Sequence, residues 1–303
     1  MSVINTGSHP KALWPGIKRW YGMNYQRYQP IWPKMFEVME STQSYEETVE
    51  DVGFGLMSVK GQGSAVSYDT AQQGTVSRFV NLTYSLGYAV TMEEIQDNLY
   101  EKLSFKRSGR LARSVAETFE IVHANVFNRG FNSSYTGGDG VSLFSTAHPT
   151  ANGTQSNRLA VDADISEASI EDMIVQIMNA TDTRGLRFNN MVRGLFVSTA
   201  NFFEANRIVS SVLQNDTANN ATNVIKATNQ FPDGILVNPY FDDSDAWFIR
   251  TTCADGGLVH FDRMAPTFDQ DNDFDTKNLK ASVITRFSTG WDNWRQIYGS
   301  SGA

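Results

Sequence analysis

Apolar and polar residues alternate along residues 76–90, a pattern that predicts a β-strand. In "TVSRFVNLTYSLGYAV" the even-numbered positions are large and mostly apolar, and the residues between them are mostly polar. A period of two is typical of a strand with one buried face. A shorter alternation at Val52, Phe54 and Leu56 precedes it, followed by the glycine-rich stretch "KGQGSAVSYDTAQQG". We therefore expect a long hairpin with a flexible tip, which needs outside support because an isolated hairpin is only marginally stable.

The pattern becomes helical after Thr91, where apolar residues recur every three or four positions up to residue 126. Thr91 and Glu94 have the spacing of a capping box, and Gly130 supplies an end. These features predict a spine helix about 55–60 Å long at 1.5 Å per residue, with Ser108 and Gly109 as a candidate kink. The apolar positions are Ile95, Leu99, Leu103, Leu111, Val115, Phe119, Val122 and Val126.

The rest of the chain mixes helices and strands, so the whole pattern predicts an α+β fold. The last segment, residues 281–300, predicts a strand, a turn containing Gly290 and an aromatic-rich end. The other expected helices cover residues 169–181 and 201–213, and the other expected strands cover residues 194–198, 234–238, 246–252 and 257–262.

Residues 9–40 combine many aromatic rings with four prolines. Prolines at this density prevent one continuous helix or a central strand, so the rings cannot all face a core formed by their own segment. They need another surface, which is either the body of this chain or a neighbouring copy. The aromatic residues are Trp14, Trp20, Tyr21, Tyr25, Tyr28, Trp32 and Phe36.

The composition narrows the classes of function. The 303-residue chain has 33 acidic and 25 basic residues, and its net charge of −8 argues against coating nucleic acid or binding an anionic membrane surface. No apolar run approaches the ~20 residues that span a bilayer, and no secretory signal is evident. The single cysteine, Cys253, permits no intramolecular disulfide and, with four scattered histidines, offers no zinc cluster. We expect folding in a reducing cytoplasm.

Ser145 and His148 in "DGVSLFSTAHPT" are the strongest candidates for catalysis. A nucleophile and its base also need an orienting acid and oxyanion donors, which this spacing does not supply. The sequence has no G-x-S-x-G motif. We expect a structural loop in which His148 bonds to the backbone and Pro149 fixes the chain. A hydrolase that uses Ser145 and His148 is the alternative.

Two other segments match ligand-binding motifs only in part. "DQDNDFD", residues 269–275, places aspartates at alternate positions, but the glycine and the glutamate of a calcium loop are both missing. "GQGSAV" lacks the third glycine of a dinucleotide-binding turn. We expect a solvated acidic turn, with a loose surface cation site as the alternative, and neither a metal centre nor a cofactor.

The order of these elements, with "DGVSLFSTAHP" and "SNRLA" (156–160), resembles the major capsid proteins of tailed bacteriophages with the Hong Kong 97-type fold. The resemblance covers nearly the whole chain. It implies an N-terminal arm over residues 1–50, an extended loop over 51–91, a peripheral domain made of 92–139 and 259–303, and an axial domain over 140–258.

The resemblance also implies a function and a set of partners. The chain would be a structural protein, not an enzyme, that forms hexamers and pentamers of an icosahedral shell around double-stranded DNA, in virions assembled in the host cytoplasm. A separate scaffolding protein and a portal would be partners, a decoration protein stays open, and the DNA would be enclosed without sequence-specific binding. The expected assembly contacts are Trp14, Trp20, Tyr25, Trp32, Lys60 and Arg78.

Some members of this family join their subunits by a Lys–Asn bond that starts from a lysine in the extended loop. Lys60 lies near the tip of that loop, but the sequence identifies neither the asparagine nor the assisting glutamate, so we expect no cross-link. A nanocompartment shell of encapsulin type, with the same fold and protein cargo, is the nearest alternative function.

Overall fold

The computed structural model describes residues 14–96, 100–214, 221–253, 255–273, 275–276 and 278–302, and the chain forms two compact units. Unit 1 consists of residues 1–46, 80–123 and 260–288, and unit 2 of residues 47–79, 124–259 and 289–303. Both units combine helices with sheets, which confirms the α+β prediction. No helix in the described ranges is long and apolar enough to cross a membrane.

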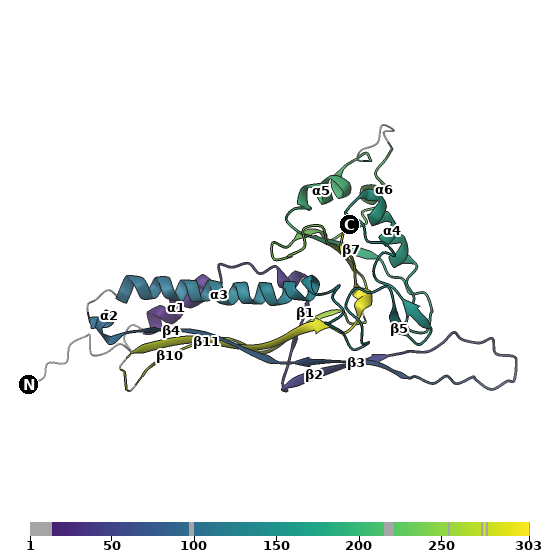
Figure 1. Cartoon of the computed structure of the whole chain (residues 1–303). Helices are drawn as coiled ribbons and strands as arrows, with labels where there is room; N and C mark the ends of the chain where they lie inside the picture. Colours follow the sequence, from purple (N-terminus) through teal and green to yellow (C-terminus); the bar gives the residue numbers. More distant parts are fainter. Residues whose placement is uncertain are drawn as a thin grey trace, which may run out of the picture. The chain divides into compact units, whose positions relative to one another are not determined.

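Unit 1 is a four-stranded sheet with a long helix along one face (Figure 1). The strands lie in the order β1-β10-β11-β4, and β11 pairs antiparallel with β4. Val115 and Phe119 of α3 pack against Val283 and Phe287 of β11. The elements are α1 (Trp14–Tyr25), the 3₁₀ helix η3 (Trp32–Lys34), β1 (Glu37–Glu40), β4 (Leu82–Val90), α2 (Met92–Gln96), α3 (Tyr100–Asn128), β10 (Leu258–Asn272) and β11 (Leu279–Trp291).

Two helices, α2 and α3, lie within the predicted spine helix, and residues 97–99 between them are outside the described residues. The 29 residues of α3 make it about 43 Å long. Thr91 Oγ1 accepts a hydrogen bond from the Glu94 backbone N–H at 3.3 Å, as the capping prediction requires. α3 continues through Ser108 and Gly109 as one helix, because this turn lies in the core with Ser108 and Leu111 buried. The side chains at residues 95–105 lie outside the description.

Part of the N-terminal segment packs on unit 1 itself. The Trp32 ring stacks on the rings of His123 and Phe119, with centroid distances of 4.3 and 5.8 Å. Tyr21 and Phe36 are buried as well. Of the two alternatives for covering these rings, the body of this chain rather than a neighbouring copy is therefore correct for Tyr21, Trp32 and Phe36.

His123 and His260 form a buried pair beside Trp32, Phe119 and Phe287, and we call these five residues the histidine cluster. His123 Nδ1 lies 2.6 Å from the Phe119 carbonyl oxygen, and its Nε2 lies 3.0 Å from His260 Nδ1. Because a carbonyl only accepts, His123 Nδ1 carries the proton and Nε2 accepts one from His260. Burial lowers the pKa of His123 to about 3 and that of His260 to about 4, so both rings are neutral.

Unit 2 contains a second four-stranded sheet, in the order β12-β9-β7-β8, in which β8 alone runs parallel to β7. Ile170 and Ile177 of α4 pack on Leu195 and Trp247 of the sheet. All the elements predicted between residues 169 and 252 are present within a few residues of their expected ends. The elements are β2 (Tyr45–Asp51), β3 (Gln73–Val80), β5 (His148–Thr150), β6 (Gly153–Gln155), α4 (Glu167–Met178), β7 (Val192–Val197), α5 (Phe202–Ser210), α6 (Val224–Ala227), β8 (Gly234–Val237), β9 (Trp247–Thr251), η4 (Trp294–Gln296) and β12 (Ile297–Ser300).

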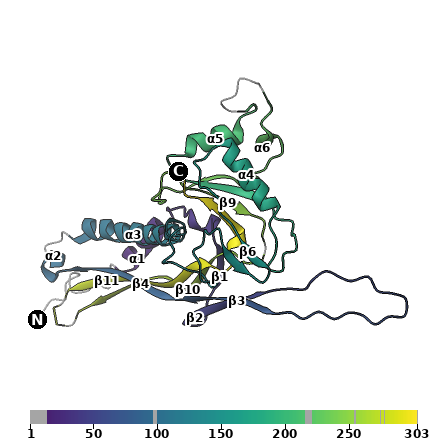
Figure 2. The ribbon, with the colours of Figure 1, turned by 45° about the vertical axis from the view of Figure 1, so that its right-hand side comes forward.

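The predicted hairpin is formed by β2 and β3, and its loop projects well beyond the two strands (Figure 2). The expected first strand at residues 52–56 is wrong, because β2 ends at Asp51. Asp51 Oδ1 accepts a hydrogen bond from the Gly53 N–H at 3.1 Å, and Gly53 has a φ of +65°. This local turn takes the chain out of the strand conformation before the apolar alternation begins.

The predicted long strand over residues 76–90 is two strands, β3 and β4, separated by Asn81. In β3 the buried residues are Ser77 and Phe79, whereas Val76 and Val80 are exposed, the reverse of the prediction. In β4 the even-numbered Tyr84, Tyr88 and Val90 pack on the core as predicted, whereas Leu82 and Leu86 are exposed. One residue outside a strand is enough to exchange its two faces.

Asn81 is buried and interrupts the alternation through its side chain. Its Nδ2 donates to Ser41 Oγ at 2.7 Å and to the Gln43 carbonyl oxygen at 3.0 Å. Its Oδ1 accepts from Ser288 Oγ at 3.0 Å. These side-chain bonds explain why the chain changes its pairing partner at this residue.

Strand β10 continues well past its predicted end at residue 262 and includes half of the expected acidic turn. Asp269 and Asp271 are exposed on this strand, whereas Phe268 and Gln270 face inward. Acidic residues on the exposed face of a half-buried strand give the same alternation as a loop of aspartates. Gly290 likewise lies inside β11 rather than in a turn.

Candidate functional site

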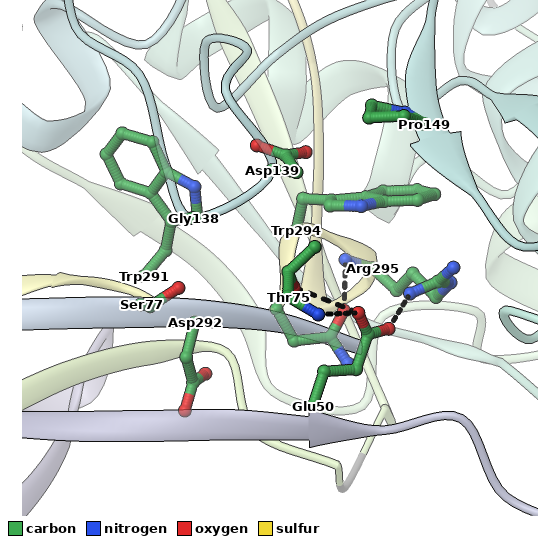
Figure 3. A pocket seen from close by; sticks show the side chains of 11 residues that line it. Glu50, Thr75, Ser77, Gly138, Asp139, Pro149, Trp291, Asp292, Trp294 and Arg295 are labelled. Atoms are coloured by element: carbon green, nitrogen blue, oxygen red, sulfur yellow. Dashed lines mark hydrogen bonds and ion pairs between the residues drawn. The ribbon is translucent and has the colours of Figure 1, made fainter. Parts of the chain in front are cut away.

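Glu50 in β2 lies at the root of the hairpin, where Figure 3 shows its contacts with Thr75 and Arg295. Its Oε1 accepts from Thr183 Oγ1 at 2.6 Å and from Arg295 Nη1 at 3.2 Å. Its Oε2 accepts from Thr75 Oγ1 at 2.9 Å. We call Glu50, Thr75, Thr183 and Arg295 the Glu50 junction. It joins both strands of the hairpin to the turn after α4 and to the 3₁₀ helix η4.

The junction holds a largely buried ion pair whose hydrogen bonds are satisfied. Arg295 is 5% exposed, and its guanidinium also donates to the Thr181 carbonyl oxygen and lies over the ring of Trp294. Burial alone would raise the pKa of Glu50, but hydrogen bonds from Thr183 and Thr75 and the charge of Arg295 hold it below its usual range. Removing one partner of such a pair leaves a buried charge uncompensated, so these side chains specify the geometry of the root.

A polar hollow of about 560 Å³ opens beside the junction. Its walls include the root of the hairpin and the loops that carry Cys253 and Asp292. Burial raises the pKa of the Cys253 thiol, which makes it a poor nucleophile. Within the described part of the chain, no three or more His, Cys, Asp or Glu side chains are grouped so that they could hold a metal ion.

His148 is fully buried and is held by side chains, not by the backbone as expected. Its Nδ1 lies 2.6 Å from Asp139 Oδ2, its Nε2 lies 3.0 Å from Asn157 Oδ1, and its ring stacks on Trp294 at 4.2 Å. Asn157 lies close to His148 because the chain returns on itself through β5 and β6. We call Asp139, His148, Asn157 and Trp294 the His148 network.

Asn157 fixes the orientation of this network. Its Nδ2 donates to the carbonyl oxygens of Leu143, Trp294 and Ile297, so its Oδ1 must face His148 and the Ser145 backbone N–H. Both ring nitrogens of His148 therefore lie within hydrogen-bond distance of a side-chain oxygen.

Ser145 and His148 are not arranged as a nucleophile and its base. Ser145 Oγ accepts from the Ala147 backbone N–H at 3.1 Å. A general base needs a ring nitrogen that faces the nucleophile, and the two nitrogens of His148 face Asp139 and Asn157 instead. The geometry gives no support to the hydrolase alternative.

The structure does not bring the six expected assembly residues together. Trp32 lies in the histidine cluster of unit 1, and Trp20, at 37% exposure, and Tyr25 lie on α1. Lys60 is exposed in the hairpin loop, and exposed Arg78 pairs with Glu47 on the neighbouring strand at 2.6 Å. Trp14 begins α1, and its side chain lies outside the description.

The residues of the Glu50 junction and most of the His148 network were not identified from the sequence. Glu50 and Arg295 are 245 positions apart, and single charges at such a distance look like surface residues. One signal was present for Asn157, which belongs to the quoted "SNRLA" stretch without a role assigned to it. A second signal was the basic residue within "WDNWRQ", because an arginine between aromatic residues often stacks on a ring.

The side chains of Glu50, Arg295, His148 and Asn157 all hydrogen-bond to other groups of the chain, which is typical of a structural joint. A family model described as phage capsid protein matches residues 75–300, and the chain therefore belongs to this family. No curated protein matches the sequence.

Solved capsid structures share the fold at low sequence identity. The capsid structure of the cyanophage P-SCSP1u is 9% identical with a TM-score of 0.60, covering 91% of this chain and 88% of that one. The capsid of Myoviridae phage XM1 is 8% identical with a TM-score of 0.53, covering 91% and 93%. A virus-like particle from Pyrococcus furiosus is 11% identical with a TM-score of 0.52, covering 94% and 97%. With this fold, of the Hong Kong 97 type, and this family, the chain is a phage major capsid protein.

Proposed function

We propose that this chain assembles as hexamers and pentamers into an icosahedral shell that encloses double-stranded DNA in a virion. The supporting observation is the hairpin loop, on which Leu56, Met57, Val59 and Tyr68 are 83%, 99%, 101% and 94% exposed. Single exposed apolar residues are ordinary, but several on one projecting loop indicate a surface that another molecule covers. In a shell, that molecule is the next copy of the chain.

The receiving surface that we propose is the edge of the sheet in unit 1. β4 is the last strand of that sheet, and beside it lies a mainly apolar groove of about 200 Å³ that includes Leu86, Val115 and Phe119. An extended segment can add to a free strand edge and place alternate side chains in such a groove. Phe54 and Leu56 have the required alternation.

The six expected assembly residues and the four domain assignments remain proposals within this function. Lys60 and Arg78 lie on the hairpin and would meet a neighbouring copy directly. Trp32 would act through its own unit, because its ring already packs on His123 and Phe119. Trp14, Trp20 and Tyr25 belong to α1, the part of the described N-terminal segment best placed to extend a contact.

The other partners follow from the same function. A scaffolding protein and a portal would guide closure of the shell in the host cytoplasm, and a decoration protein would bind its outer surface. The net charge of −8 means that few phosphates would be held, so the enclosed DNA would stay free to move. We infer that the chain has no enzymatic activity, because its one candidate pair is committed to structure.

A cargo-holding nanocompartment is the second candidate function, favoured by the similarity to the virus-like particle from Pyrococcus furiosus. That similarity is no stronger than those to the phage capsids, so it does not displace the first. The contents of purified particles separate the two, since DNA indicates a virion and folded protein cargo indicates a nanocompartment.

The test of assembly is sedimentation of the purified protein with electron microscopy of the fast fraction. Closed shells or six-fold rings are expected, and a monomer under all assembly conditions would contradict the proposal. Changing Leu56, Met57 and Val59 to Ser should abolish closed shells. The same change at Val161, Val175 and Met178, exposed apolar residues of unit 2 outside the hairpin, should leave them intact.

Deletion of residues 1–40 should also block closed particles, but that variant is harder to interpret. It removes Tyr21 and Phe36, which are buried in unit 1, so a loss of shells would also follow from misfolding. The hairpin variant changes only exposed side chains and is the sharper test.

A further inference from the structure

We propose that the turn at residues 181–187 is a two-point clamp that fixes the direction of the hairpin. Thr183 binds the root of the hairpin by a hydrogen bond to Glu50, which we call the inner point. Arg184 binds the hairpin farther along by an ion pair with Asp69, which we call the outer point. The inference rests on the proposed function, in that the clamp matters because the hairpin must reach a neighbouring copy. Its basis is a set of contacts within unit 2.

The turn itself is rigid enough to serve as a clamp. Asp182 Oδ1 accepts from the backbone N–H groups of Arg184 and Leu186 at 2.9 and 2.7 Å. The Gly185 N–H donates to the Asp182 carbonyl oxygen at 3.0 Å, and Gly185 has a φ of +85° that favours glycine. These bonds hold Thr183 and Arg184 toward the hairpin without help from it.

The inner point is buried and charged. Thr183 is 9% exposed and donates to Glu50 Oε1, which Arg295 also binds. Because the interior screens charge poorly, this contact persists at high salt. The root of the hairpin therefore stays attached under all ordinary conditions.

The outer point is exposed and weaker. Arg184 Nη1 lies 2.7 Å from Asp69 Oδ2, and Nη2 donates to the Thr70 carbonyl oxygen at 2.6 Å. Asp69 Oδ2 also accepts from the Gly55 N–H at 2.7 Å, so one carboxylate ties both sides of the loop together at this level. The side chain of Asp69 is 46% exposed, so salt screens the pair.

With both contacts formed, the hairpin is held in one direction. With only the Thr183–Glu50 contact formed, the hairpin can rotate about its root. When the outer pair opens, the loop swings about Glu50 while its root remains in place. A segment held in its binding direction loses less freedom on contact with a partner, so the clamp raises the yield of productive encounters between copies.

The test measures the hairpin direction in the full-length chain, with assembly not required. Spin labels are attached at Met57→Cys and Val161→Cys, two positions exposed at 99% and 82%, in a Cys253→Ser background. Pulsed electron resonance then gives the distribution of distances between hairpin and body. Labelled chains diluted into unlabelled ones allow the same measurement in particles.

The unsubstituted clamp should give one narrow distribution at low salt that broadens at 1 M salt. Arg184→Ala should raise the population outside the main peak about two- to fivefold at low salt, with no further change on adding salt. Arg184→Lys keeps the charge near Asp69 but loses the bond to Thr70, so it should restore the peak in part. Thr183→Val should broaden the distribution at both salt concentrations, and Thr183→Ser should restore it.

The matched control is Arg193→Ala, which removes another exposed ion pair of unit 2, to Asp233 at 2.9 Å, and should leave the distribution unchanged. A broad distribution with the clamp intact, or equal broadening in Arg193→Ala, overturns the proposal. Broadening in Arg184→Ala without any shell formation keeps the clamp and defeats the proposed function. If shells form but Arg184→Ala leaves the distance distribution unchanged, the proposed function stands and the clamp is refuted.

Discussion

Unit 1 and unit 2 each bury a histidine completely, and they hold it in opposite ways. In unit 1, His123 faces a second histidine, a carbonyl oxygen and aromatic rings. In unit 2, His148 faces the carboxylate of Asp139 and the amide of Asn157. The first site is stable only while it carries no charge, and the second is built from polar groups that complete one another. The comparison shows why protonation of histidines in acid is expected to weaken the core of unit 1, whereas the His148 site of unit 2 depends on an unbroken hydrogen-bond network.

The largest expected effect is the loss of Asn157 from the His148 network. Asn157→Leu should lower the free energy of unfolding by more than about 4 kcal/mol, because several buried carbonyl and N–H groups lose their partner at once. Chemical denaturation measures this. Asn179→Ala removes an exposed side-chain bond and should stay within about 0.5 kcal/mol. Equal effects at the two positions would refute the role given to Asn157.

The second effect is a loss of stability in acid that originates in unit 1. The pKa of His123 is lowered to about 3 and that of His260 to about 4, whereas unfolded histidines titrate near 6.5. The unfolded chain therefore takes up protons first as the pH falls, and the free energy of unfolding decreases below pH 6.5 until the folded rings titrate. We expect a loss of about 4 kcal/mol between pH 6.5 and 4.5 from the pair.

The other ionisable groups near the pair do not reverse this direction. Burial raises the pKa of Glu120 and of Asp262, which adds some stability in acid, but by a smaller shift than those of the histidines. His260→Asn keeps a donor toward His123 and removes one titrating ring, so the loss between pH 6.5 and 4.5 should fall by about half. An unchanged pH profile in this variant would show that the acid sensitivity arises elsewhere.

The third effect tests the ring that covers the histidines. Trp32→Ala should cost about 2 kcal/mol, because the ring is only partly buried, and should flatten the pH profile by letting water reach His123. Thermal unfolding at pH 7 and pH 5 measures both changes. Trp20→Ala on exposed α1 is the control, expected to lower stability less and to leave the pH dependence as it was.

The smallest effect on stability concerns the exposed ion pair on the hairpin. Arg78→Ala should change the free energy of unfolding by less than about 1 kcal/mol, because Arg78 and Glu47 are 59% and 38% exposed. If Arg78 contacts a neighbouring copy, the yield of closed shells should nevertheless fall, as sedimentation would detect. A normal yield removes Arg78 from the proposed contacts.

The elements governed by simple periodicity were predictable, and those governed by one side chain were not. The strands of unit 2 and the helices α4 and α5 follow from local apolar patterns. The exchange of buried faces at Asn81 does not, because it depends on hydrogen bonds to Ser41 and Ser288 from distant segments. The fold class and the approximate ends of the regular helices and strands could therefore be predicted from the sequence.

The candidate site was harder to predict for a physical reason. His148 was singled out, but its partners could not be, since any nearby acceptor fits the same spacing. Glu50 and Arg295 meet only in the folded chain, and each looks like a surface charge where it stands in the sequence. The family resemblance located the hairpin as the functional part without indicating what holds its root.

The Glu50 junction also sets an order of events during synthesis. Thr183 follows Glu50 by 133 residues and Arg295 follows it by 245. At 5–20 residues per second, roughly 10–50 s pass between the translation of Glu50 and that of Arg295. Throughout this interval the root of the hairpin on a nascent chain lacks its buried counter-charge. The hairpin of a ribosome-bound chain is thus not yet fixed in its direction. Only a chain translated through Arg295 can present neighbouring copies with a hairpin in its final direction.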